Sequence, residues 1–160
     1  MSTNIHGGIE FRHPGVGTDY YEGEPWVAAM DLWPLYDQTD YASFGCLFGV
    51  RNHVGFQPLA AGRGLPVDLS SGLRPHLGPS VAEGGLTDAT WVSWAEIAGL
   101  DPLLTGGAEG ATEPPRRGDD RLTAGAVLGA GTHWPHVFAV MRAMAGRFGD
   151  DAVRLVVAFD

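Results

Sequence analysis

The chain has 160 residues, of which 44% are hydrophobic, and it contains five Trp, seven Phe and four Tyr. This composition can build one packed core, so it excludes global disorder and predicts a single domain over residues 1–160. No apolar run approaches the ~20 residues of a membrane helix, and the first residues lack a signal-peptide pattern. We therefore expect a soluble, cytoplasmic protein that makes no membrane contact.

The formal net charge of −9 disfavours non-specific binding to DNA or RNA, because such binding requires a basic face that displaces counterions. All ten basic residues are arginine. Guanidinium or backbone N–H groups must therefore hold any bound anion, and lysine-dependent chemistry is excluded. The single cysteine, Cys46, excludes an intramolecular disulfide, and we interpret it as a small buried side chain.

The first third of the chain predicts a hairpin followed by a helix. Residues 4–12 and 24–32 have the apolar alternation of strands, and the second strand would place Trp26, Ala28 and Met30 on one face. Asp40 is a predicted N-cap, and an apolar stripe follows it as far as Gly49, a residue typical of helix ends. Residues 50–66 have no sustained period, and an ordered loop of that length is often a binding segment.

The middle of the chain predicts short elements. Residues 67–77 allow a short helix that Pro75 would break, and residues 78–85 would cross back as a flexible segment. Residues 90–92 predict a strand. Ser93 and Glu96 then have the spacing of a capping box, which predicts a helix to about residue 100.

The last third contains the clearest helix and the clearest strand. Residues 105–120 are rich in Gly, Pro and charge and predict a flexible surface insertion. Residues 122–131 fit either a strand or a helix. Residues 134–148 carry apolar side chains at helical spacing, and residues 152–159 form a continuous apolar run typical of a buried central strand. We therefore predict an α+β fold with a mixed, mostly antiparallel sheet packed by two or three helices.

The loop after the first predicted helix holds the best candidate binding residues. Arginine offers a planar fork for phosphate or carboxylate, and glycine lets backbone N–H groups approach a ligand closely. Trp91 and Trp94, on either side of the capped Ser93, would supply a stacking surface for a base or sugar, but we favour core packing for Trp94. The alternatives are that Arg51 pairs with a structural carboxylate such as Asp31, that the Gly-Arg-Gly segment is only a turn, and that the tryptophans pack in the core. The predicted ligand-binding residues are Arg51, Asn52, His53, Arg63, Gly64, Trp91 and Ser93.

No familiar catalytic or metal-binding signature is present in the sequence. His133 and His136 could share one side of a helix start, and His6 and His13 could share the hairpin, but no spacing supplies a third ligand. We therefore assign no catalytic residue, no metal ligand and no cofactor.

Several segments, in order, resemble a family of small uncharacterised proteins from tailed phages, prophages and GC-rich bacteria. The matching motifs are W-x-x-x-x-D-L from Trp26, D-Y-x-x-F-x-x-L-F-G-V-R-N from Asp40, G-F-x-P-L from Gly55, R-G-L-P from Arg63, W-V-S-W-A-E-I from Trp91, and the terminal V-R-L-V-V-x-F-D. The resemblance implies no established activity. Many members carry a Gly-His-Ser-His-Ser stretch before the tryptophan segment, whereas residues 85–90 here read GLTDAT and contain no histidine. Because of this departure from the family, we expect a binding protein rather than an enzyme.

Three hypotheses for the function follow from these features. The first is a protein that binds, and sequesters, an anionic nucleotide-derived small molecule, such as a host immune signal in a phage counter-defence role. The second is an interaction or inhibitor protein whose acidic surface contacts a protein partner. The third is a nucleotide-processing enzyme with His53 or His76 as the general base. The many apolar aromatic residues would also allow a homodimer.

Overall fold

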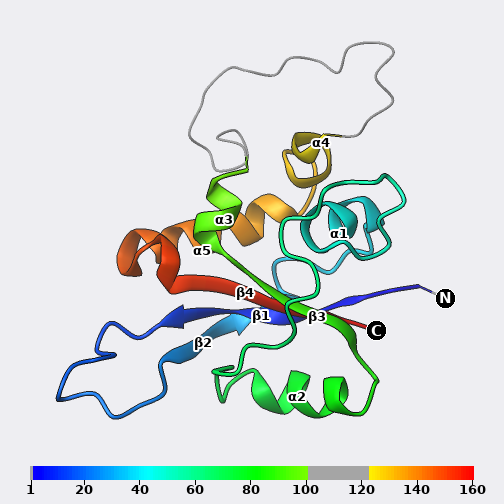
Figure 1. The fold of residues 1–160 in the computed structure, drawn as a ribbon. Coiled ribbons are helices and arrows are strands. Elements are labelled where there is room, and N and C mark those ends of the chain that lie inside the picture. Colours follow the sequence, from blue (N-terminus) through cyan, green and yellow to red (C-terminus); the bar gives the residue numbers. More distant parts are fainter. Residues whose placement is uncertain (1, 101–122) are drawn as a thin grey trace.

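The computed structural model describes residues 2–100 and 123–160. At its centre lies a four-stranded antiparallel sheet with the strand order β2-β1-β4-β3 (Figure 1). The sheet confirms the predicted α+β class and the central position of the C-terminal strand. The four strands are β1 (Ile5–Arg12), β2 (Trp26–Asp31), β3 (Thr87–Ser93) and β4 (Val153–Phe159).

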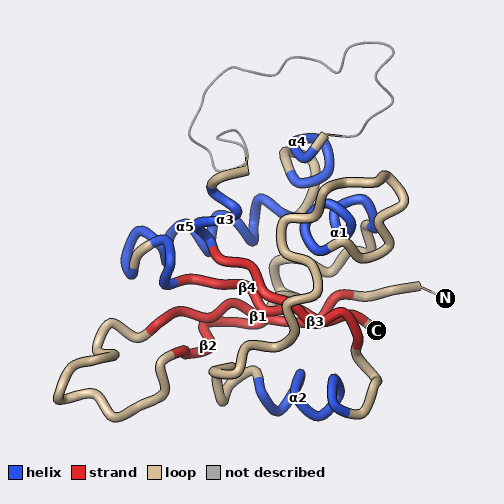
Figure 2. Tube along the Cα trace, viewed as in Figure 1, coloured by secondary structure: helices blue, strands red, loops and turns tan. Residues whose placement is uncertain are grey.

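The helices cover the two faces of the sheet unequally. One face carries α1 (Tyr41–Phe48), α3 (Trp94–Ala98), α4 (Ala124–Leu128) and α5 (Trp134–Phe148), whereas α2 (Arg74–Ala82) packs alone against the other (Figures 1 and 2). A short 3₁₀ turn (Asp150–Ala152) leads from α5 into β4. No helix within residues 2–100 and 123–160 is both long and apolar enough to cross a membrane.

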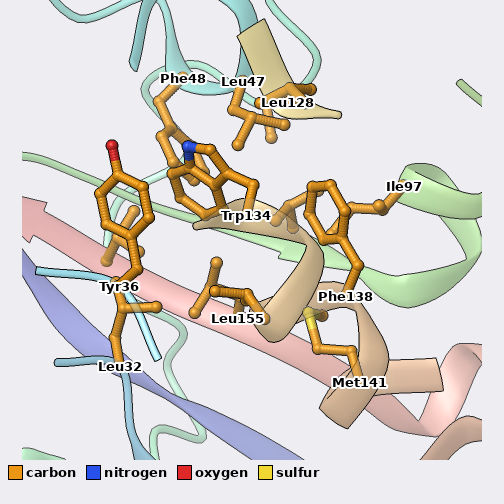
Figure 3. Close-up of a cluster of buried hydrophobic side chains, with 14 of the residues drawn as sticks. Leu32, Tyr36, Leu47, Phe48, Ile97, Leu128, Trp134, Phe138, Met141 and Leu155 are labelled. Atoms are coloured by element: carbon orange, nitrogen blue, oxygen red, sulfur yellow. The ribbon is translucent and has the colours of Figure 1, made fainter. Parts of the chain in front are cut away.

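The main core lies between the sheet and the four-helix face, and Trp134 stands near its middle (Figure 3). Its indole stacks on Tyr36 with ring centroids 4.2 Å apart. Burial of Tyr36 raises the pKa of its phenol, and burial of Cys46 raises the pKa of that thiol to about 11. Trp94 is buried and contacts Phe138, which confirms the interpretation of Trp94 as a core residue.

A second, smaller core lies under α2. It joins three leucines on and before that helix to Val156 and Ala158 of β4. Every residue of β4 is buried, because alternate side chains enter the main core and the second core. This two-sided burial explains why β4 is a continuous apolar run rather than an alternating one. The three leucines are Leu69, Leu73 and Leu77.

The local capping signals confirm several predicted ends of helices. The Asp40 carboxylate accepts a hydrogen bond from the Ala42 N–H, and Gly49 ends α1 in the left-handed conformation with φ 71°. Ser93 and Glu96 form the reciprocal bonds of the capping box at the start of α3. These signals are local, so the sequence predicts them reliably.

A β-bulge changes which side chains of β2 lie on the same face of the sheet. Ile9 pairs with Met30, but Glu10 pairs with Ala28, so β2 carries one extra residue at this point. Met30 consequently packs against the main core, whereas Ala28 packs against the second core. The prediction that Trp26, Ala28 and Met30 share one face is therefore wrong for Met30.

Two other elements differ from their predictions. Pro75 lies in the first turn of α2, where its missing N–H costs no helical hydrogen bond, so it starts the helix instead of breaking it. Residues 78–82, predicted as a flexible crossing, continue that helix. Within the ambiguous segment 122–131, residues 124–128 form α4, capped by Thr123. The predicted insertion at 105–120 lies outside the described residues.

Gly7 provides a test of the packing between β1 and β4. A Cβ at this position would lie 2.0 Å from the backbone oxygen of Val156, and neither central strand can move aside easily. Gly7→Ala should lower the free energy of unfolding by at least ~2 kcal/mol, measured by urea denaturation. Gly146→Ala is the control. That site on α5 is open, so alanine should stabilise the protein by up to about 1 kcal/mol. Equal effects of the two substitutions would contradict the packing.

Candidate functional site

A cavity of about 620 Å³ opens on the α2 face of the sheet, beyond the start of the α2 segment. Its walls come from all four strands or their ends and from the loop that precedes α2. We call it the arginine cavity, because Arg12, Arg63 and Arg154 line it. The same lining contains two tryptophans, Trp26 and Trp91.

The inner wall is built on one row of residues that crosses the sheet. Ala28, Glu10, Arg154 and Ser93 lie opposite one another on β2, β1, β4 and β3. The row places a carboxylate and a guanidinium side by side on the two central strands. A charged residue at this depth requires a partner, because the cost of desolvation is otherwise several kcal/mol.

The Glu10–Arg154 ion pair supplies that partner. Arg154 Nε lies 2.7 Å from Glu10 Oε1, and the two residues are 5% and 0% exposed. The other carboxylate oxygen of Glu10 accepts the Ser70 N–H at 2.7 Å, and Arg154 Nη1 donates to Asp68 at 3.0 Å. The guanidinium also lies 3.9 Å from the ring centroid of Trp26. Arg154 is thereby fixed in one orientation at the base of the cavity.

The outer wall depends on how the loop after α1 passes the edge of β3. Ala60 belongs to the main core and Leu65 packs against the second core, so the chain changes faces between these residues. Gly62 and Gly64 have φ of 66° and 78°, a conformation that glycine adopts without strain. The Gly64 N–H donates to the Ala89 carbonyl at 2.8 Å. This path places Arg63 beside β3.

Arg63 closes over Trp91 and is held by Glu96. Its two terminal nitrogens donate to the two Glu96 oxygens at 2.8 and 2.5 Å, and one of them also donates to the Trp91 carbonyl. The guanidinium carbon lies 4.7 Å from the Trp91 ring centroid. The hydrogen bonds from Arg63 lower the pKa of the Glu96 carboxyl, and those to Glu96 raise the pKa of Arg63.

Arg12 differs from the other two arginines of the cavity. It is exposed at the end of β1, opposite Trp26, and its side chain has no hydrogen bond or ion pair within the described part of the chain. The cavity therefore contains two guanidinium groups with carboxylate partners and a third that can turn toward a ligand. Three carboxylates also line it, so the formal charges of the three arginines and the three carboxylates cancel. The carboxylates belong to Asp68, Glu96 and Asp151.

The structure brings together some of the residues predicted for the site. Arg63, Trp91 and Ser93 line the arginine cavity, and Gly64 lies in the chain that forms its edge. Ser93 also accepts the Glu96 N–H in the capping box, so its hydroxyl has a structural role.

The remaining predicted residues do not line this cavity. Arg51 Nε donates to the Thr3 hydroxyl rather than to Asp31, and its guanidinium lies over Tyr41. The Asn52 side chain donates to the Phe56 carbonyl and accepts the Phe56 N–H, so it shapes a turn. His53 is exposed beside it.

Sequence reasoning missed Arg12, Trp26 and Arg154. A usable signal existed for Arg154, because a single charge inside the apolar run of residues 152–159 requires a partner across the sheet. Glu10 offers the matching signal in the first strand. Pairing them needs the register of β1 against β4, which the sequence does not supply.

The histidines form no metal centre within residues 2–100 and 123–160, where no group of three or more His, Cys, Asp or Glu side chains is placed to hold an ion. The rings of His133 and His136 lie 5.9 Å apart at the start of α5. Their pairing follows from the helical spacing and lacks a third ligand.

The Arg63–Glu96 pair predicts a pH-dependent contribution to stability. The pKa of Glu96 is lowered, so the pair stabilises the fold above the unfolded pKa of glutamate, ~4.3, and the contribution is lost as the pH falls through the folded pKa. Both side chains are about 30% exposed, so the effect should stay below ~1 kcal/mol. Arg63→Ala should therefore destabilise the protein at pH 7, in urea denaturation, and have less effect at pH 3.

The double variant Arg63→Ala/Glu96→Gln is the control for this test. Glutamine keeps the capping box, so the second substitution should add little once Arg63 is gone. If Arg63→Ala lowered the free energy of unfolding equally at pH 7 and pH 3, the result would contradict the proposed contribution of the ion pair.

No protein-family model, curated protein or solved structure matches this chain.

Proposed function

We propose that the arginine cavity binds an anionic small molecule with a flat aromatic ring, of the nucleotide-derived class, and retains it unchanged. The observation that carries the proposal is the convergence of an unpaired guanidinium, Arg12, with two tryptophans in one cavity. Its volume of about 620 Å³ lies within the ~300–1,000 Å³ of typical ligand pockets.

Arg12 is the group best suited to the anion. A guanidinium binds phosphate or carboxylate through two parallel hydrogen bonds, which favours arginine over a point charge. Arg63 and Arg154 already donate to carboxylates, so they contribute positive potential and fixed walls. Because the fixed charges of the cavity nearly balance, Arg12 should decide whether an anion is favoured over a neutral ligand.

Trp91 is the surface best suited to a flat ring. Arg63 lies over its ring as Arg154 lies over the ring of Trp26, but Trp91 is only partly buried, whereas Trp26 is 8% exposed. Trp91 therefore offers more free ring surface. Stacking of a base on an aromatic side chain contributes ~1–3 kcal/mol and tolerates any base. A nucleotide with its ring near Trp91 and its phosphate near Arg12 uses both features.

The chemistry of the lining favours retention of the ligand over turnover. No histidine, cysteine or tyrosine is among the described residues that line the cavity. The lowered pKa of Glu96 makes this carboxylate a poor proton acceptor near neutral pH. For a chain that resembles phage proteins, sequestration of a nucleotide signal of host immunity is the biological use that we propose.

Native mass spectrometry with a panel of mononucleotides and cyclic nucleotides tests this function, followed by calorimetry on any nucleotide retained. Arg12→Ala should weaken binding about tenfold, because it removes one charge-assisted hydrogen-bonding group. Trp91→Leu should weaken it by a similar factor. Nucleotide released by denaturation should have its original mass.

Arg147→Ala is the matched control, because Arg147 also covers an aromatic ring but lies outside the cavity. It should leave the affinity unchanged. The proposal fails if no nucleotide of the panel is retained, or if neither cavity substitution weakens binding. A released product of altered mass would instead indicate an enzyme.

A further inference from the structure

A second cavity of about 650 Å³ lies on the same face of the sheet as the arginine cavity. Its walls come from the first residues of β1, the end of β2, the α2 helix and the turn before β3. We call it the Trp33 cavity. It shares no lining residue with the arginine cavity.

The charges of the two cavities differ. No arginine is among the described residues that line the Trp33 cavity, whereas the carboxylates of Asp31 and Asp160 both line it. Among the described residues of this lining, the other titratable side chains are those of His6 and His76. A ligand that enters here encounters carboxylates without a guanidinium to balance them.

The two carboxylates are not equivalent. Asp160 accepts hydrogen bonds from Asn4 and contacts His6 Nε2 at 3.0 Å, and these bonds lower the pKa of its carboxyl. The Asp31 side chain has no hydrogen bond or ion pair within the part of the chain that the structure describes. Asp31 is therefore the carboxylate that can still accept a donor from a ligand.

Trp33 and the floor of the cavity add aromatic and apolar surface. Trp33 is 71% exposed, although burying an aromatic side chain of this size is normally favourable. The face of an indole ring attracts a cation, and tryptophan is the strongest such partner among the side chains. Leu73, Leu77 and Leu86 line the floor, so the cavity also offers contact to methylene groups.

We propose that the Trp33 cavity binds an alkylammonium group, with the charge between Asp31 and Trp33 and the alkyl chain along the leucines. A free diamine or polyamine and a lysine side chain of another protein share this chemistry. The site is separate from the proposed nucleotide site, and neither proposal depends on the other.

Titration by heteronuclear NMR and calorimetry tests this inference. The probes are 1,5-diaminopentane, pentylamine and the neutral pentan-1-ol, together with a blocked Gly-Lys-Gly peptide. The amines should shift the indole N–H signal of Trp33, which is assigned by its loss in Trp33→Leu. Pentanol should not shift it at the same concentration. Added salt should weaken amine binding, because the site is open to solvent.

Asp31→Asn and Trp33→Leu should each weaken amine binding at least fivefold. Both side chains are exposed, so both variants should fold, which circular dichroism and urea denaturation check. Asp19→Asn and Tyr20→Leu are the matched controls, because they change an exposed carboxylate and an exposed ring in the hairpin loop. These two variants and Arg12→Ala should bind the amines as the original protein does.

The relative affinities identify the source of the cation. Tighter binding of the diamine supports a free amine, and tighter binding of the lysine peptide supports a protein partner. The inference is overturned if no probe binds up to about 10 mM, beyond the weak end of specific affinities. It is also overturned if pentanol binds as well as pentylamine, or if neither cavity substitution weakens binding.

Discussion

The ion pair between Glu10 and Arg154 is the constraint on which the α2 face depends. It joins the two central strands at a point where an unpaired charge would cost several kcal/mol, so the register of β1 against β4 is tied to this contact. A slip of one residue would turn one of the two side chains toward the apolar main core and leave the other without its partner. The same two side chains hold the loop before α2 through Ser70 and Asp68. One polar contact therefore aligns the sheet and anchors the segment that walls the arginine cavity.

The unequal helical cover of the sheet explains why both cavities lie on one face. A nine-residue helix such as α2 is about 13 Å long, whereas a strand of eight residues such as β1 spans about 27 Å. Leu77 of α2 and the two leucines before the helix cover only part of that face, and the two cavities open on the remainder. On the opposite face, the 15-residue α5 and three further helices fill the space with the main core.

Structural features that depend on residues close in the sequence could be predicted, whereas features that depend on the register between strands could not. The caps at Asp40 and Ser93, the helix from Trp134 to Phe148 and the buried final strand follow from local chemistry or periodicity. The bulge in β2 does not, because one extra residue opposite β1 leaves no local mark. The residues predicted for the site lie in two different places, because their positions also depend on tertiary structure. Arg63 and Trp91 meet through the path of the loop around β3, whereas Arg51 and His53 precede that turn.

The passage of the loop around β3 also covers part of an edge strand of the sheet. An uncovered edge strand offers its backbone groups to another chain and can start aggregation. Along β3, the Ala89 carbonyl already accepts the Gly64 N–H, and the Thr90 hydroxyl bridges to Ala60 and Arg63. The loop thus covers part of this edge, at Ala89 and Thr90. Opening of the Gly-Arg-Gly segment would expose this part of the edge together with the wall of the arginine cavity, so substitutions there should also favour pairing of β3 with another chain.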